Sequence, residues 1–315
     1  MVFSIDVYNR NYLDGMCALY NAETVFEPHI AQFTPDLFVE LVEKKSYFDP
    51  SGLFVAIESG KVIGWVHACV SAGSEGHHDP NNKVPRIRML IYPCNRLKIG
   101  STLVTEATAW LKSSGQNKFF AMHAQMGYPF YRGLWFGGEP MCPTAMPHLH
   151  IAFESGGYKT TQESIFMASE MDQHPKEAST DLALEFVESE ADMAHEPMRE
   201  SWIGFKPMKT QAFMGDENVG IISWVIIPYV ADRLGAPCIN IWGLGIPENH
   251  RKKGIATALV SRAMVCSYEQ GAKFVSVSTQ LWNAPAQATY AKLGFKPRHI
   301  VMGRILDLEG ENESP

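Results

Sequence analysis

The chain has 315 residues, of which 46% are apolar, and its formal net charge is −7. This length and apolar content predict two ordinary domains with buried cores. The acidic balance argues against a general nucleic-acid-binding surface, which carries excess Lys and Arg to neutralise phosphates, so we expect any anion site to be local.

The six cysteines are scattered, with no C-x-x-C pair. This pattern indicates reduced thiols rather than a zinc site or a redox dithiol. No apolar run reaches the length of about eighteen residues that suggests a membrane span, and the N-terminus has no signal-peptide pattern. We therefore expect a cytoplasmic protein without a metal ion, a nucleic-acid partner or a membrane partner, and a homo-oligomer is left open.

The first half of the chain predicts a hairpin followed by a strand, a helix and two more strands. The stretch FVAIESGKVIGWVHACV (54–70) is two apolar runs around a polar turn, which is typical of a β-hairpin. A strand into LIYP (90–93), a helix over 99–114 and the strand KFFAMHA (118–124) follow. The stretch ESGGYKTTQESIFMASEM (154–171) then turns from a short helix through glycine into a final strand.

The second half repeats this plan. FMGDENVGIISWVIIP (213–228) is again a hairpin, and IWGLGIP (241–247) is the next strand. A helix over 255–270, the strand KFVSVST (273–279) and the closing segment KLGFKPRHIVMGRI (292–305) complete it. The repeat predicts two domains of one fold.

The polar segment DQHPKEASTD between the halves has no apolar periodicity and reads as a linker. The boundaries predicted are 1–171 for the first domain, 172–181 for the linker, 182–308 for the second domain and 309–315 for a disordered tail. The aromatic, glycine-rich insert GYPFYRGLWFGGEP (127–140) is either an element packed between the domains or part of an acceptor pocket.

The stretch PENHRKKGIATALV (247–260) concentrates positive charge at the start of a helix. The first N–H groups of a helix lack intrahelical partners, and the helix dipole adds partial positive charge there. Gly254 lets the backbone turn inward, and Arg251 adds a forked cation at the rim. The sequence therefore predicts a phosphate site, with a solvated basic turn as the alternative.

A second segment, NAPAQATYAKLGF (283–295), follows after one strand. Together the two segments resemble the GNAT superfamily of acyl-coenzyme A-dependent N-acyltransferases. The family signature is Arg/Gln-x-x-Gly-x-Gly/Ala followed by Asn-x-x-Ala-x-x-x-Tyr-x-x-x-Gly-Phe. This chain keeps its spacing at Arg251, Gly254, Ala256, Asn283, Ala286, Tyr290, Gly294 and Phe295, and the resemblance extends over about 180–308.

The resemblance implies a mixed α/β fold of two GNAT-like domains. Each would be a mostly antiparallel twisted sheet flanked by helices and splayed between its fourth and fifth strands, where acetyl-CoA binds. Backbone groups around 244–246 would bind its pantetheine arm, and those of 252–257 its pyrophosphate. The implied cofactor-binding residues are Leu244, Gly245, Ile246, Arg251, Lys252, Lys253, Gly254, Ile255, Ala256, Thr257, Asn283 and Ala286.

Acetyl transfer from a thioester to an amine needs a neutral amine and a proton for the departing thiolate. Tyr290 matches the family tyrosine that acts as general acid, with a core tyrosine as the alternative. The strand INIWGLGI carries no carboxylate that could be the base. Glu248 and His250 are expected to be rim residues, so the base is water-mediated or comes from the other domain.

The first half lacks the same signature. Phe153 stands at the position of Tyr290, Met146 at that of Asn283 and Lys98 at that of Gly254. Phenylalanine cannot donate a proton, so this half is interpreted as a degenerate GNAT-like domain without catalysis.

Three other clusters carry weaker expectations. His77, His78 and Asp79 are not expected to bind metal, nor are His148 and His150. Trp202 and Phe205, in HEPMRESWIGFKPM (195–208), are either walls of an acceptor pocket or core residues.

The sequence therefore predicts an N-acetyltransferase that acts on a primary amine, expected to be a small molecule. A non-catalytic acyl-CoA sensor or partner-binding protein is one alternative, which the intact Tyr290 disfavours. A protein N-acetyltransferase is the other, because the motifs recognise the donor rather than the acceptor.

Overall fold

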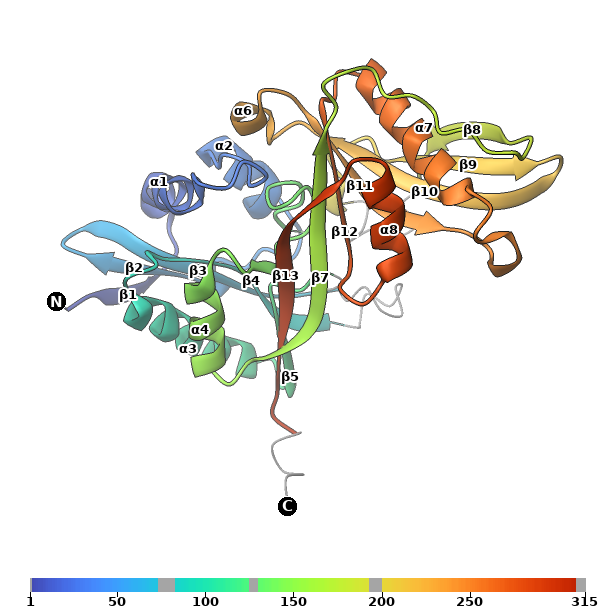
Figure 1. The fold of residues 1–315 in the computed structure, drawn as a ribbon. Helices are drawn as coiled ribbons and strands as arrows, with labels where there is room; N and C mark the ends of the chain where they lie inside the picture. Colours follow the sequence, from blue (N-terminus) through green and yellow to red (C-terminus); the bar gives the residue numbers. More distant parts are fainter. Residues whose placement is uncertain (1, 73–82, 125–129, 193–199, 310–315) are drawn as a thin grey trace.

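The computed structural model describes residues 2–72, 83–124, 130–192 and 200–309. These residues form one mixed sheet of thirteen strands that runs through both halves of the chain (Figure 1). Most neighbouring strands are antiparallel, and the parallel pairs are β4 with β5 and β11 with β12. The mixed α/β class and the splayed, mostly antiparallel sheet expected from the resemblance are confirmed.

The first half follows the predicted order of elements. Its hairpin is β2–β3, its long helix α3 ends before Gly115, and Gly115 has the positive φ of 73° expected of a C-terminal cap. The elements are β1 (Ser4–Val7), α1 (Leu13–Thr24), α2 (Pro35–Phe38), β2 (Leu53–Glu58), β3 (Lys61–Ala72), β4 (Lys83–Ile91), α3 (Leu97–Lys112), β5 (Lys118–Ala121), β6 (Cys142–Pro143), α4 (Pro147–Ser155) and β7 (Lys159–Glu170).

The second half repeats the hairpin, the strand, the long helix, the strand, the short helix and the last strand in the same order. Its long helix α7 ends before Gly271, which has a φ of 95°. The elements are β8 (Glu185–Glu190), β9 (Met208–Met214), β10 (Glu217–Ile227), α6 (Ala231–Leu234), β11 (Cys238–Gly245), α7 (Ile255–Glu269), β12 (Phe274–Gln280), α8 (Ala284–Lys292) and β13 (Lys296–Asp307).

The last strand of each half crosses into the sheet of the other half. The strand order is β1-β2-β3-β4-β5-β13-β7-β12-β11-β10-β9-β8. Thus β7 pairs with β12 over Ser164–Glu170, and β13 pairs with β5. The two exchanged strands also pair with each other and stand side by side at the centre of the molecule (Figure 1). The sequence analysis did not predict this exchange.

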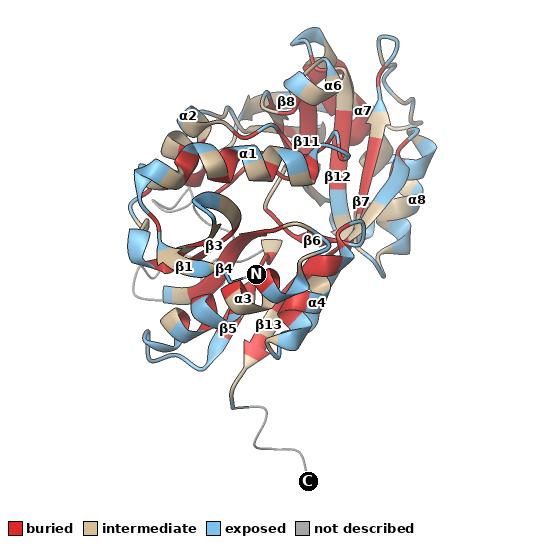
Figure 2. Ribbon diagram, turned by 90° about the vertical axis from the view of Figure 1, so that its left-hand side faces the viewer, coloured by how far each residue is buried: buried red, intermediate tan, exposed pale blue. Residues whose placement is uncertain are grey.

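Two apolar cores lie on the sheet. One core lies in the second half and contains residues of α7, α8, β11 and β12, including Ile255, Tyr290 and Val277. The larger core lies in the first half and extends to Trp202 and Ile227 of the second half. Figure 2 shows the buried residues running along the strands of both halves.

The insert 127–140 is described from Phe130 onward and packs between the halves. Trp135 is fully buried, and an added Cβ at Gly133 would lie 2.8 Å from Phe205 of the second half. The Arg132 guanidinium lies 3.9 Å from the ring centroid of Trp202. The insert is therefore an element packed between the halves, as the first of the two interpretations held.

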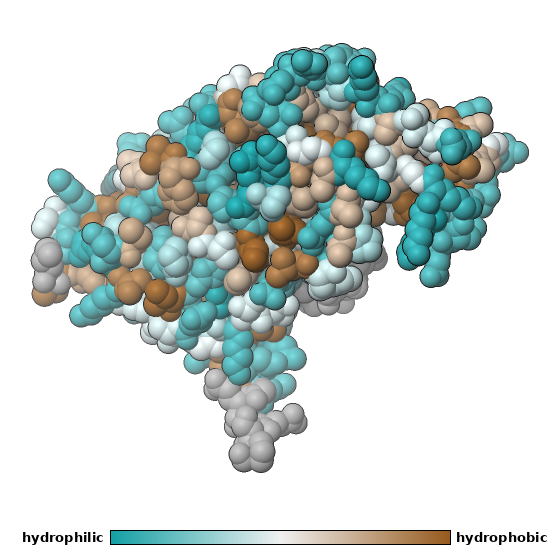
Figure 3. Space-filling model, in the orientation of Figure 1, coloured by the Kyte–Doolittle hydropathy of each residue, from teal (hydrophilic) through white to brown (hydrophobic). Residues whose placement is uncertain are grey.

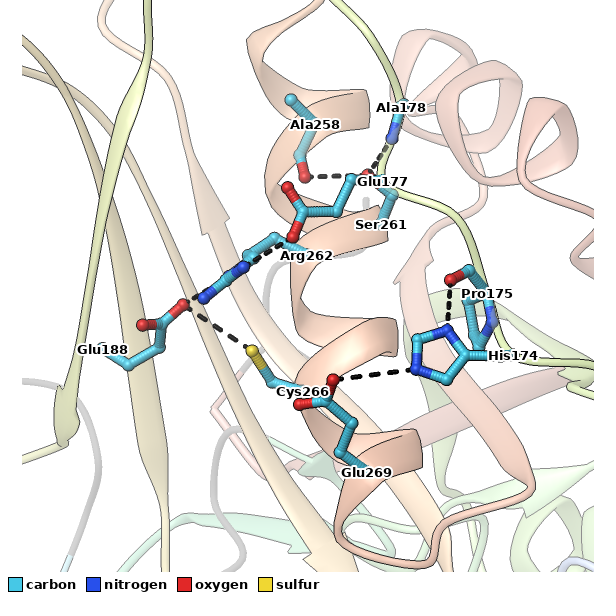
Figure 4. Close-up of polar contacts among 10 residues, drawn as sticks. All are labelled: His174, Pro175, Glu177, Ala178, Glu188, Ala258, Ser261, Arg262, Cys266 and Glu269. Atoms are coloured by element: carbon cyan, nitrogen blue, oxygen red, sulfur yellow. Dashed lines mark hydrogen bonds and ion pairs between the residues drawn. The ribbon is translucent and has the colours of Figure 1, made fainter.

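The segment 172–181 forms no helix or strand, but it is fastened to α7 (Figure 4). Ser261 Oγ accepts a hydrogen bond from the Ala178 backbone N–H at 2.8 Å. Arg262 pairs with Glu177 at 2.5 Å and with Glu188 of β8 at 2.6 Å. The linker thus runs along one side of α7.

No helix among the described residues is long and apolar enough to cross a membrane. On the face shown in Figure 3, hydrophobic side chains form small separate groups among hydrophilic ones.

Candidate active site

The sheet opens between β11 and β12. These strands pair in parallel from Cys238 with Phe274 to Ile241 with Val277, and no further. On the outer sides the ladders continue, with β11 paired to β10 as far as Gly245 and β12 paired to β7 as far as Gln280. The ends of β11 and β12 therefore diverge, which creates the opening predicted between the fourth and fifth strands.

A β-bulge marks the start of this opening. Ser223 of β10 pairs with Gly243 and Trp224 pairs with Ile241, so Trp242 is left without a partner in the ladder. Trp242 is 38% exposed, and Ser278 on the facing strand is also exposed. The side chains of both strands are therefore accessible where the ladder between β11 and β12 ends.

Steric crowding within the protein does not explain why residues 243 and 245 of β11 are glycines. An added Cβ would lie 3.5 Å from Ser223 at Gly243 and 3.5 Å from Ile221 at Gly245, which are ordinary contacts. Their lack of a side chain leaves the backbone of β11 open beside the predicted pantetheine site at Leu244, Gly245 and Ile246.

The turn before α7 has a backbone shape that favours glycine. Gly254 is the N-cap, with a φ of 84°, and Lys252 also has a positive φ, of 64°. An added Cβ at Gly254 would lie 3.6 Å from Thr180 Oγ1, so the backbone angle rather than crowding demands glycine here. A non-glycine residue at positive φ is strained, and such strain is common at ligand-binding loops.

The cations of this turn are available to an anion. Arg251, Lys252 and Lys253 are exposed, and among the described residues none of them forms an ion pair. Arg251 Nε donates to the Ile246 carbonyl at 3.2 Å, which places the guanidinium between the end of β11 and the helix. Ile255, Ala256 and Thr257 form the first turn of α7, whose N–H groups are the predicted phosphate ligands.

His250 lies beneath this turn rather than at its rim. It is 7% exposed, and its Nε2 lies 2.8 Å from Glu217 Oε1 of β10. Its Nδ1 is buried without a partner among the described residues. His250 therefore anchors the turn to β10, whereas Glu248 is exposed, as a rim residue should be.

Tyr290 lies on α8 in the same apolar core as Ile255 and the last paired residue of β12, Val277. The fold thus brings together the predicted acid, the start of α7 and the bottom of the opening. Tyr290 is 4% exposed, and burial raises its pKa to about 12. Its hydroxyl makes no hydrogen bond to a described residue, so it can donate one to a ligand.

Asn283 and Ala286 hold the start of α8. Asn283 Oδ1 accepts a hydrogen bond from the Ala286 N–H at 3.3 Å and is the N-cap of the helix. The amide oxygen of Asn283 is therefore used within the protein, and its amide nitrogen is the group left for a ligand.

An aromatic pair lies on the side of the opening that faces the first half. Trp202 and Trp242 have ring centroids 5.5 Å apart at 43°, and Arg132 covers Trp202. Trp202 belongs to the core shared with the first half, whereas Tyr290 belongs to the core around α7 and α8. The opening therefore connects two different sides of the sheet.

The corresponding region of the first half is filled by its own side chains. The Tyr92 ring packs so closely on α3 that an added Cβ at Gly100 would lie 2.1 Å from Tyr92 Cζ. The Tyr92 hydroxyl donates to the His148 carbonyl, and Phe153 is fully buried. Arg96, at the N-cap of α3, makes two 2.8 Å hydrogen bonds to Glu58. The turn 92–96 before α3 contains no residue with positive φ.

The other polar clusters lie only partly among the described residues. His77, His78 and Asp79 lie outside the described residues. His150 is held by Pro143 and Arg304 rather than facing His148. Across the described ranges, no group of three or more His, Cys, Asp or Glu side chains could hold a metal ion.

Sequence reasoning missed several residues that shape the site. Trp242 could have been found as the large residue before Gly243 in a strand expected to bulge. Glu217 contacts His250, and Tyr92 packs on Gly100. No sequence motif indicates either contact.

The sequence model of the Acetyltransferase (GNAT) family matches residues 167–295. Residues 167–295, which make up most of the C-terminal half, are similar to the GNAT acetyltransferase family. The match begins within β7 and ends just before β13. This GNAT domain is an acyltransferase domain, and it contains the opening, the turn before α7 and Tyr290. No curated protein sequence matches the chain.

Solved structures share the fold of the whole chain. A GCN5-related N-acetyltransferase from Sphaerobacter thermophilus has a TM-score of 0.63 at 14% identity, covering 97% of this chain and 96% of that one. A tandem GNAT protein from the clavulanic acid biosynthesis pathway has a TM-score of 0.63 at 16% identity, with 98% of both chains covered. A glucosamine N-acetyltransferase region of a fungal multi-domain β-N-acetylglucosaminidase has a TM-score of 0.64 at 13% identity, covering 96% of this chain and 38% of that one.

Proposed function

We propose that the C-terminal GNAT domain transfers an acetyl group from acetyl-CoA to a primary amine of a small molecule. The observation that carries this proposal is the left-handed turn at Gly254. This turn places the exposed side chains of Arg251, Lys252 and Lys253 at the start of α7, and among the described residues none of them forms an ion pair. Phosphates are the ligands that suit such a helix start.

The donor fits the residues that surround the opening. The N–H groups of 252–257 would hold the pyrophosphate, and the backbone of Leu244, Gly245 and Ile246 would hold the pantetheine arm. When bound, acetyl-CoA supplies an activated acyl group on a thioester. Tyr92 and Gly100 leave no comparable space in the first half, so we expect one donor site per chain.

Tyr290 acts on the leaving group by hydrogen bonding. A thiol has an ordinary pKa of about 8.5, whereas burial raises the pKa of Tyr290 to about 12. Complete proton transfer from Tyr290 to a free thiolate would therefore be uphill by roughly 4 to 5 kcal/mol. A short hydrogen bond from the Tyr290 hydroxyl to the sulfur, formed as negative charge develops there, lowers the barrier without this cost.

The amine must lose a proton before or during attack. Neither β11 nor β12 carries a titratable group other than the buried Cys238 at the start of β11, so these two strands supply no general base. We propose that this proton leaves to water, which reaches the opening beside the exposed Ser278. The cytoplasmic location expected from the sequence stays a prediction.

The experiment is a screen of primary amines with the full chain and acetyl-CoA, in which the free thiol is detected. The proposal predicts thiol release that depends on the amine and an acetylated product of matching mass. Saturable donor binding without thiol release from any small amine would instead support the sensor. Transfer only to a peptide or protein would support the protein N-acetyltransferase.

A further inference from the structure

Trp242 is partly exposed, although the residues that precede it in the same strand are buried. The residues before it in β11, from Cys238 to Ile241, are at most 6% exposed, whereas Trp242 is 38% exposed. It is the unpaired residue of the bulge and follows the last pair between β11 and β12. Because this indole packs on a second ring beside the proposed donor site, it is a candidate surface for a ligand.

The Trp242 ring is supported from behind. It contacts Trp202, which is 5% exposed, and the Arg132 guanidinium of the first half covers Trp202 at 3.9 Å. Arg132 is held by a hydrogen bond to Ser201 at 3.1 Å and by its ion pair with Glu139. The support fixes the indole in place, so a ligand that stacks on it loses little of its binding energy to ordering the protein.

The wall offers aromatic rings on which a flat group can stack. The described residues in ring or cation contact with Trp202 and Trp242 are Phe205 and Arg132, and the Arg132 guanidinium is paired with the Glu139 carboxylate. Ser278 across the opening is small and neutral. A polyamine would need carboxylates beside its second charge, whereas a flat apolar group needs a ring to stack on.

We propose that Trp242 is the stacking wall of the acceptor site and that the acceptor is an amine carrying an aromatic ring. This rests on the proposed acetyl transfer and names its class of substrate. The amine enters from the side of the sheet that faces the first half. The first half thereby contributes to specificity through Arg132 and Trp202.

The test compares matched amines on the full chain with acetyl-CoA. Phenylethylamine and tryptamine are compared with hexylamine, which has no ring, and with spermidine. We expect kcat/KM for the two aromatic amines to be at least tenfold higher than for the others. Trp242→Ala should raise KM for the aromatic amines about tenfold or more, while kcat and the donor Kd change little. Trp242→Phe should retain most of the activity.

Trp282→Ala is the control, because Trp282 is 78% exposed but lies in the loop before α8. It should leave KM for the aromatic amines unchanged. Acetylation of all four amines with similar kcat/KM, or preference for spermidine, would overturn this inference and leave the proposed function standing. A Trp242→Ala variant that loses donor affinity instead of amine affinity would also overturn it. Donor binding with no acetylated amine would overturn the proposed function, and the inference with it.

Discussion

Ser164 of β7 and Val301 of β13 pair with each other at the centre of the sheet, and each is the seventh residue after the glycine that precedes its strand. Those glycines, Gly157 and Gly294, both have positive φ, of 83° and 88°. The two halves are thus related by an approximate two-fold axis at this pair, and each half completes the sheet of the other.

This exchange predicts that neither half is stable alone. In a fragment of residues 172–315, β12 would lose β7, and β13 would lose β5 and β7, which exposes long unpaired strand edges. We expect this fragment to be insoluble or inactive by solubility and thiol-release assays. Co-expression with residues 1–171 should restore a soluble, active complex. A fragment that is monomeric and fully active alone would show that the exchange is not needed.

Gly254→Lys should weaken donor binding at least tenfold without unfolding the protein. The lysine copies Lys98 of the first half and is strained at a φ of 84°. Isothermal titration with acetyl-CoA should give one site per chain for the wild type and a Kd at least tenfold higher for the variant. Gly235→Lys is the matched control, because Gly235 has a φ of 83° and no atom within 4 Å of an added Cβ. Equal loss of affinity in both variants would mean that strain alone is responsible.

Glu27 should link the two halves in a pH-dependent way. Its carboxylate lies 2.5 Å from His299 Nε2 of β13 and 3.0 Å from His29 Nδ1. Burial alone raises the pKa of Glu27, but the hydrogen bonds from His29 and His299 outweigh it and lower the pKa to about 2. A lowered carboxylate pKa stabilises the fold above the unfolded pKa of about 4.3, and this contribution is lost as the pH falls toward 2.

Glu27→Gln should therefore reduce the stability by roughly 2 to 3 kcal/mol at pH 6, and the difference from wild type should shrink between about pH 4.5 and pH 2. Urea unfolding at several pH values measures this. Glu106→Gln, at an exposed glutamate of α3, is the control. A difference that stays constant down to pH 2 would exclude this role for the Glu27 carboxylate.

The value of kcat/KM should rise with pH and should not fall again at high pH. The amine becomes nucleophilic as it loses its proton, and the pKa of Tyr290, raised by burial to about 12, keeps its hydroxyl protonated. We therefore expect kcat/KM to increase with pH up to about pH 10, the upper limit of a stable measurement. A loss of activity between pH 8 and pH 10 in a folded protein would mean that a group more acidic than Tyr290 must stay protonated.

The sequence predicted the elements of each half, because these depend on local signals, whereas the donor-site residues stay a prediction. Gly254, Asn283 and Tyr290 lie in motifs with fixed spacing, and the left-handed φ of Gly254 is the kind of conformation for which glycine is used. The strand exchange was not predictable, because β7 and β13 have the same apolar pattern whichever sheet they join. Trp202 and Trp242 are far apart in the sequence, so no local pattern encodes their contact.

The most direct test of the role of Tyr290 is the single-turnover rate of acetyl transfer by Tyr290→Phe, measured with saturating acetyl-CoA and an amine that the wild type acetylates. The substitution removes one hydroxyl and keeps the ring, which packs on Phe295 at 5.4 Å, so the fold and the donor Kd should be unchanged. We expect the rate of Tyr290→Phe to be about 10²- to 10⁴-fold below that of the wild type, which is the usual scale for a group that assists a leaving group. A rate within a few-fold of wild type would contradict it and leave Tyr290 as a core residue.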